Sequence, residues 1–166
     1  PVFDNVALPL IIAGVSHRDA GRRVRAALAQ VGLLHKEKQP PQTLSAGAQQ
    51  PVGIARALAL EPKFIVCDEP TSALDVSIQA QVINLLMDLQ EDFGLSYLFI
   101  SHDMSVIQHV CKRIAVMYKG KIVEEGSRDE IIDNPQHRYT QSLVSAVPEP
   151  DPHRKIERVV FDGGAM

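Results

Sequence analysis

Residues 64–75 read FIVCDEPTSALD and give the clearest indication of the fold. The first four of these residues form a short apolar run between Glu61-Pro62 and two acidic residues. Such a run predicts a strand that is buried on both faces, as in a parallel sheet. Asp68 and Glu69 then stand at the carboxyl end of this strand, the edge at which open α/β sheets bind ligands.

The two carboxylates suit two different tasks. Mg²⁺ prefers hard oxygen ligands, so Asp68 is a candidate to hold this ion, usually through water. The adjacent side chain points elsewhere, so Glu69 is a candidate to polarise an attacking water. Taken alone, the dipeptide is better explained as a solvated acidic turn, and only the surrounding motifs reverse that preference.

The residues downstream alternate between helical and strand patterns. The predicted elements are an amphipathic helix over 77–90 that Gly94 ends, a strand over 97–100, a helix over 104–110, a strand over 114–117 and a hairpin turn over 118–121. This order predicts an α/β fold with a mainly parallel sheet. Residues 128–133 and 139–147 predict short helices, and the prolines of 148–152 predict an extended linker.

The residues upstream are helical in pattern. Apolar residues recur at helical spacing in 20–31, namely Val24, Ala27, Leu28 and Val31. Residues 36–43 are polar and contain two prolines, which predicts a loop, and a second helix follows as far as about residue 60. We therefore expect three parts: a helical part over 1–60, an α/β core over 61–127 and a C-terminal extension over 128–166.

The composition excludes several classes of protein. The 166 residues carry a net charge of −3 without a Lys/Arg-rich block, which argues against a dedicated nucleic-acid binder. Cys67 and Cys111 are too few for a disulfide framework, and we expect two buried thiols. No apolar run has the length of a membrane span. The first residues are not typical of a natural start, so we expect a fragment or an engineered chain.

Four motifs in a fixed order give the chain a family resemblance. LSAGAQQ over 44–50 stands where the ABC ATPases have their signature, Leu-Ser-Gly-Gly-Gln. Asp68-Glu69 followed by Ser72-Ala73-Leu74-Asp75 resembles the Walker-B segment and D-loop of that family, and Ser101-His102-Asp103 resembles its switch-histidine motif. The resemblance covers nearly the whole chain. It implies a partial P-loop NTPase-like sheet with an α-helical signature subdomain, lacking the N-terminal strands and the P-loop.

The resemblance also implies roles for individual residues. Glu69 and His102 would be catalytic, with His102 on the γ-phosphate, and Asp68 would hold Mg²⁺. Residues of the signature and D-loop would contact ATP held by a second subunit in a head-to-tail dimer, namely Ser45, Gly47, Gln50 and Asp75. A simple helix N-cap is the structural alternative for Ser45. The resemblance also implies an integral membrane permease as a partner and no nucleic-acid partner. It implies that the protein lies at the cytoplasmic face of a bacterial membrane.

The C-terminal half resembles one branch of the family. Residues 72–81 and NPQHRYTQSL over 134–143 look like the dipeptide and oligopeptide importer ATPases, although Arg138 replaces their usual Pro. Residues 2–10 and 24–34 look more like the cell-division and methionine-import branches. We therefore form the hypothesis of a chimera joined between about residues 44 and 64.

Several family features are absent or altered. No Gly-x-x-x-x-Gly-Lys-Ser/Thr occurs in residues 1–166, so we expect the chain alone to bind ATP poorly. In the signature, Ala46 replaces Gly, Ala48 replaces Gln or Glu, and Pro51 replaces Arg, and we expect signature-dependent closure to be impaired. The favoured function is an ATPase part that drives peptide import. The alternatives are a cell-division type of ABC ATPase and an inactive module that docks on a permease.

Overall fold

The computed structural model describes residues 1–147, except for the side chain of Ala46. The chain divides into two compact units, the first over Pro1–Ile100 and the second from Ser101 onward. The three predicted parts, with boundaries at residues 60 and 127, stay a prediction. The predicted linker over 148–152 lies outside the described residues.

The first unit begins with a layer of helices, as the sequence predicts. Its elements are α1 (Val2–Ile12), α2 (His17–Gln30), the short 3₁₀ turns η1 (Leu34–Lys36) and η2 (Pro41–Thr43), and α3 (Ala46–Leu58). The predicted loop over 36–43 thus contains the turn η2. The apolar residues predicted on one face of α2 are all buried, and they pack with Val6, Leu10 and Ala55 into one core.

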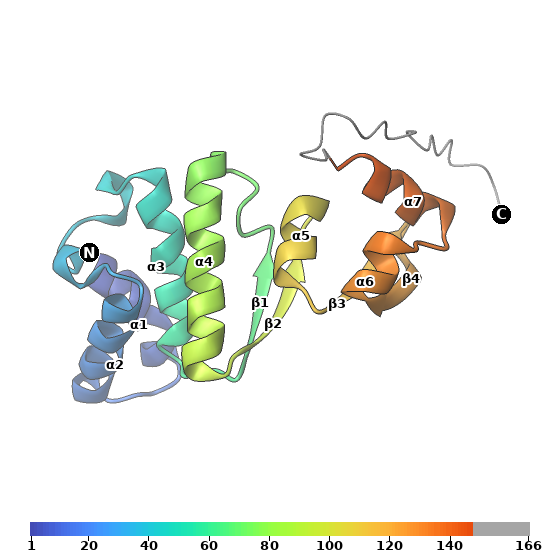
Figure 1. Ribbon diagram of the computed structural model, residues 1–166. Helices are drawn as coiled ribbons and strands as arrows, with labels where there is room; N and C mark the ends of the chain where they lie inside the picture. The colour runs from blue at the N-terminus through green and yellow to red at the C-terminus, as the bar shows by residue number, and fades with distance from the viewer. Residues whose placement is uncertain (148–166) are drawn as a thin grey trace. The chain divides into compact units, whose positions relative to one another are not determined.

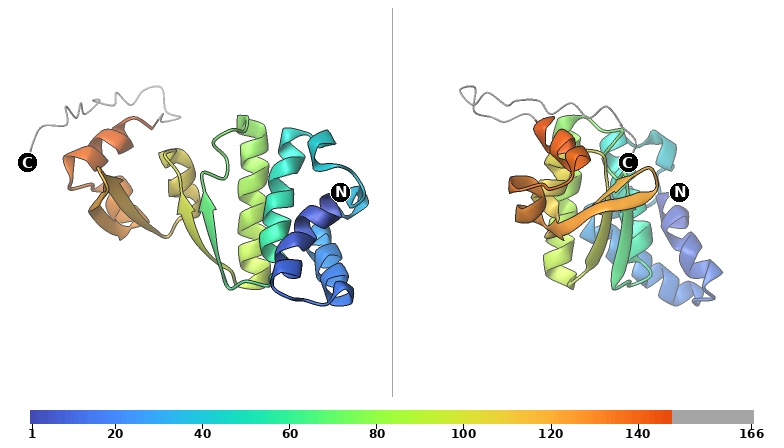
Figure 2. Two further views of the ribbon diagram at one scale, coloured as in Figure 1. Left: turned by 180° about the vertical axis from the view of Figure 1, so that it is seen from behind. Right: turned by 90° about the vertical axis from the view of Figure 1, so that its right-hand side faces the viewer.

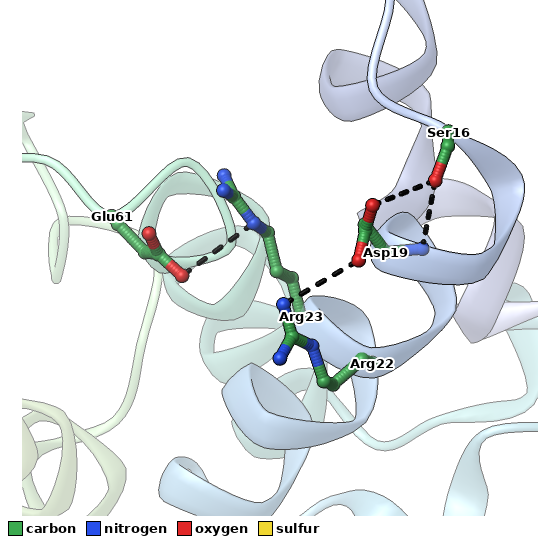
Figure 3. A network of polar contacts seen from close by, with 5 residues as sticks. All are labelled: Ser16, Asp19, Arg22, Arg23 and Glu61. Carbon is green, nitrogen blue, oxygen red and sulfur yellow. Dashed lines mark hydrogen bonds and ion pairs between the residues drawn. The ribbon is translucent and has the colours of Figure 1, made fainter.

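Polar contacts hold the start of α2 and connect this helix to the turn before the first strand (Figure 3). Ser16 caps α2, because its Oγ accepts the N–H of Asp19 at 3.2 Å and donates to the Asp19 carboxylate at 2.8 Å. Arg23 of α2 lies 3.5 Å from the carboxylate of Glu61, in the turn before the first strand. The helical layer is therefore tied to the start of the sheet.

The sheet of the first unit is a parallel pair, β1 (Phe64–Asp68) and β2 (Ser96–Ile100), joined by α4 (Val76–Phe93). Within the first unit, α4 lies between the helices that precede it and the strands (Figures 1 and 2). Val82 and Leu86 of α4 pack against Cys67 on one face of the pair. Burial raises the pKa of the Cys67 thiol to about 11, so this expected buried thiol is neutral.

The prediction that these strands are buried on both faces is wrong for the residues described. Phe64, Val66 and Leu98 on the other face are exposed by 55%, 54% and 50%. Alternate side chains point to opposite faces, and among the described residues of this unit only the face toward α4 is covered. The apolar sequence shows that both faces suit burial, but it does not show which element covers them.

The second unit contains α5 (Met104–Val110), β3 (Arg113–Tyr118), β4 (Lys121–Ser127), α6 (Arg128–Asp133) and α7 (Arg138–Ser145). The predicted hairpin turn is confirmed: Lys119 and Gly120 both have positive φ, 47° and 76°. β3 pairs antiparallel with β4, so parallel pairing is confirmed for β1 and β2 and does not extend to the third predicted strand. Cys111 is half-buried and free.

The importer-like motif over 137–140 builds the start of α7. The His137 Nδ1 accepts the N–H of Tyr139 at 3.1 Å, the Tyr139 ring lies 4.5 Å from that of Tyr118 on β3, and Thr140 is fully buried. Arg138 is the first residue of α7, a position that also suits Pro. His137 already has the extended conformation that a following Pro requires, with φ −82° and ψ 133°.

Glu124 of β4 fixes the chain that enters α7. Its carboxylate accepts the N–H groups of Gln136 at 2.7 Å and His137 at 3.1 Å. Burial acts to raise the pKa of Glu124, but the Thr140 side chain and these two N–H groups outweigh it and lower the pKa below the ordinary value. The lowered pKa means that this contact stabilises the folded state above the ordinary glutamate range.

We expect Glu124→Gln to lower the free energy of unfolding of the second unit by about 1–2 kcal/mol at pH 7, because an amide cannot accept both N–H groups as a carboxylate does. The difference from the wild type should shrink as the pH falls through the lowered pKa, where Glu124 itself becomes protonated. Urea unfolding at a series of pH values measures both effects. Glu125→Gln is the control, since the exposed pair with Arg113 contributes little. Equal losses for both variants would contradict the account.

Candidate active site

The acidic pair lies at the carboxyl end of β1, as predicted. Asp68 is the last residue of the strand, lies opposite Ile100 in register and has an exposed side chain. Glu69 follows with φ 47°, a left-handed conformation that is uncommon for residues other than glycine. Its N–H donates to the Ile100 carbonyl at 2.9 Å, and its carboxylate oxygen Oε2 is shielded from solvent. Strained conformations of this kind cluster at functional sites.

The loop from Pro70 to Asp75 is held by local contacts. Thr71 is buried, with 3% of its surface exposed, and its carbonyl accepts the N–H of Leu74 at 3.1 Å. Asp75 is the N-cap of α4, because its carboxylate accepts the N–H of Ile78 at 2.9 Å. Asp75 therefore has a structural role in its own chain, and its contact with nucleotide stays a prediction.

The signature residues open α3. Ser45 is the N-cap by position, yet its exposed side chain makes no capping hydrogen bond within the described residues. Capping of α3 therefore does not explain why a hydroxyl side chain stands at position 45. Because the hydroxyl does not cap the helix, the free N–H groups of the first turn are available to an anion. A Cβ atom on Gly47 would lie 2.8 Å from the Ile78 Cδ1 atom, so the glycine permits the close approach of α3 to α4.

Gln50 faces the acidic loop of its own chain. Its Nε2 donates to the carbonyl oxygen of Pro70 at 2.7 Å, across 20 residues of sequence. No sequence pattern indicates this contact, because helical spacing reports only on neighbours in the same helix. Its neighbour Gln49 donates to Leu44 instead, at 3.0 Å.

Pro51 is the sixth residue of α3 and lies beyond the first turn. The N–H that another residue would supply here would pair with the Gly47 carbonyl, so the proline removes one hydrogen bond of the helix. The helix nevertheless continues to Leu58. Ala48 packs against the helical core, and the side chain of Ala46 lies outside the described part of the structure.

His102 belongs to the second unit. It lies two residues beyond β2, with an exposed side chain, and the next residue, Asp103, caps α5 by accepting the N–H of Ser105 at 2.9 Å. Within the first unit, Gln50 contacts Pro70, the residue after the acidic pair, while Gly47 and Asp75 both contact Ile78 at the start of α4. The relation of His102 to these residues stays a prediction.

The oxygen ligands available at the site suit a Mg²⁺ ion for which the protein supplies only some of the ligands. The described residues contain no group of three or more acidic, His or Cys side chains that could enclose a metal ion. The exposed Asp68 carboxylate fits an ion that takes one or two protein ligands and completes its shell with phosphate and water.

Comparison with known proteins agrees with this geometry. The family model described as ABC transporter matches residues 2–72, and that described as the oligopeptide/dipeptide transporter C-terminal region matches 123–163. A solved structure of cbiO1 from Clostridium perfringens, part of the ABC transporter complex cbiONQ, has a TM-score of 0.72 at 28% identity and covers 80% of this chain and 53% of that one. The fold is thus similar to part of an ABC transporter protein of known structure.

Two curated relatives cover most of the chain. An oligopeptide transport ATP-binding protein OppD of Mycobacterium tuberculosis is 53% identical over 156 residues, which are 93% of this chain and 26% of that protein. A glutathione import ATP-binding protein GsiA of Shigella flexneri is 52% identical over 156 residues, again 93% of this chain and 25% of that protein. The chain is thus similar to ATP-binding proteins of ABC transporters over 93% of its length. It spans about a quarter of the length of these relatives.

The single match over 156 residues overturns the hypothesis of a chimera. The first part of the chain and the importer-like C-terminal part align with the same relative, so no junction between two parents is needed. Within the described residues, no helix has the length and apolar character to cross a membrane.

We expect Pro51→Ala to raise the free energy of unfolding of the first unit by roughly 2–3 kcal/mol, because it restores an N–H inside α3. Gly53→Ala is the matched control. An added Cβ there meets nothing within 4 Å, so only helix propensity changes, which should stabilise by about 1 kcal/mol. Urea unfolding of both variants measures the difference. A smaller gain for Pro51→Ala than for Gly53→Ala would show that the proline is accommodated without loss.

Proposed function

We propose that this chain is part of an ATP-hydrolysing subunit of an ABC transporter that imports short peptides. The observation that carries the proposal is Glu69, a carboxylate held in a left-handed conformation at the carboxyl end of a parallel strand. Its N–H bond to Ile100 fixes the backbone on which the side chain stands. The relatives that are named for oligopeptide and glutathione transport support the substrate class.

In this proposal the two carboxylates divide the work. Glu69 accepts a hydrogen bond from the attacking water and so orients and polarises it toward the γ-phosphate. Asp68, which precedes it and is exposed, would hold Mg²⁺ through water. The bound ion would neutralise charge on the phosphates. A preorganised carboxylate loses little entropy when the reaction occurs, which is why a rigid loop suits this task.

The start of α3 supplies the second half of the proposed site. Ser45 and Gly47 stand at the first turn of the helix, whose free N–H groups and positive dipole end suit a γ-phosphate. In a head-to-tail dimer this surface would face ATP held by another subunit, with His102 and Asp75 completing the arrangement. The remaining proposed partner is a permease in the membrane, which places the subunit at its cytoplasmic face.

We expect Glu69→Gln, in the assembled transporter whose subunit carries this sequence, to lower ATP turnover by about 10²-fold or more while ATP still binds, because an amide cannot serve as a base. Glu61→Gln is a matched control, since Glu61 also has a positive φ, 53°, but precedes β1 at the opposite end of the strand. Phosphate release measures turnover. Equal turnover for wild type and Glu69→Gln would contradict the proposal, and no turnover in the wild type would favour the inactive docking module.

A further inference from the structure

We propose that Gln50 is a positioning residue that couples the signature helix to the proposed base, in place of a direct contact with nucleotide. The proposal rests on the proposed role of Glu69. Its basis is the 2.7 Å hydrogen bond from the Gln50 Nε2 to the carbonyl oxygen of Pro70, the residue that follows Glu69. Gln50 thus acts on Glu69 through the backbone of the next residue.

The chemistry of Pro70 makes this hydrogen bond important. A proline has no N–H, so its carbonyl is the only backbone polar group that can anchor the chain at this position. Pro70 is buried, and a buried carbonyl without a donor is costly. The Gln50 side chain supplies the donor from a different element.

The loop around Glu69 is held on both sides, and Gln50 provides the tether on the α3 side. On the strand side the Glu69 N–H bonds to Ile100 at 2.9 Å. On the α4 side the Gln79 Nε2 lies 3.4 Å from the Thr71 hydroxyl, a longer contact. Glu69 keeps its left-handed backbone between these anchors. Removing the tether at Pro70 should therefore loosen the loop from Glu69 onward and leave the strands intact.

The spacing of residues along α3 links the start of this helix to the loop that holds Glu69. Gln50 lies three residues after Gly47, so the two residues share one face of the helix. Gly47 meets Ile78 of α4 while Gln50 meets Pro70. If an anion binds at the first turn of α3, as the proposed function requires, a shift of the helix would act on the Pro70 carbonyl and so on the backbone of Glu69.

The first test measures amide hydrogen exchange in the full chain with Gln50→Met, which keeps the length of the side chain and removes the donor. We expect exchange in residues 69–75 to become about tenfold faster, with little change in residues 24–31 of α2. Gln49→Met is the matched control, since its hydrogen bond goes to Leu44. Gln50→Lys, which keeps a donor, should restore slow exchange. An equal rise throughout the first unit, or none in residues 69–75, overturns the proposal.

The second test measures ATP turnover in the assembled transporter with the same variants. A positioning role predicts that kcat for Gln50→Met falls about tenfold with KM for ATP unchanged, whereas a nucleotide ligand would raise KM. Gln50→Lys should recover most of kcat. A raised KM with unchanged kcat overturns the proposal. If Glu69→Gln leaves turnover intact, the proposed base is wrong, while the exchange experiment still decides whether Gln50 holds the loop.

Discussion

The parallel pairing of β1 with β2 is the constraint on which the candidate site depends. The two strands run in register from Phe64 and Ser96 to Asp68 and Ile100, so both end at the same edge. Ile100 is thereby placed to accept the N–H of Glu69, the first residue beyond β1. One strand pair thus sets the position of Asp68, the backbone of Glu69 and the start of the loop that leads to α4.

The helices act on this edge through few contacts. α4 packs on one face of the strand pair and begins after its capping residue, Asp75. The loop over 69–75 is therefore anchored by β1 at its start and by α4 at its end. α3 reaches the same loop through Gly47 against Ile78 and through Gln50 against Pro70. The departures from the family pattern at Ala46, Ala48 and Pro51 all lie in α3. The loop that holds Glu69 keeps its family-like residues, and the described contacts of α3 with this region are the packing of Gly47 against Ile78 and the hydrogen bond from Gln50 to Pro70.

Much of the fold was predictable from local sequence patterns. The apolar spacing in 20–31, Gly94 as the end of α4 and the turn at Lys119-Gly120 are confirmed because each depends on residues that are close in sequence. The two-sided burial of β1 and β2 was predicted wrongly, because an apolar strand does not show which element covers it. The pairing of β3 with β4, and not with the parallel pair, is likewise a tertiary choice. The position of Glu69 was predictable from its motif, but its left-handed backbone and the bond from Gln50 to Pro70 depend on contacts across 20 or more residues.

Residues 1–147 carry the proposed base, the proposed Mg²⁺ ligand and the signature surface, while a cradle for the β- and γ-phosphates requires a P-loop that residues 1–166 do not contain. Calorimetric titration of Mg-ATP should therefore compare this chain with the same chain extended upstream through a Gly-x-x-x-x-Gly-Lys-Ser/Thr segment. We expect saturable binding by the extended form alone. Tight binding by this chain alone would contradict this expectation, because it would require a nucleotide site other than the one described.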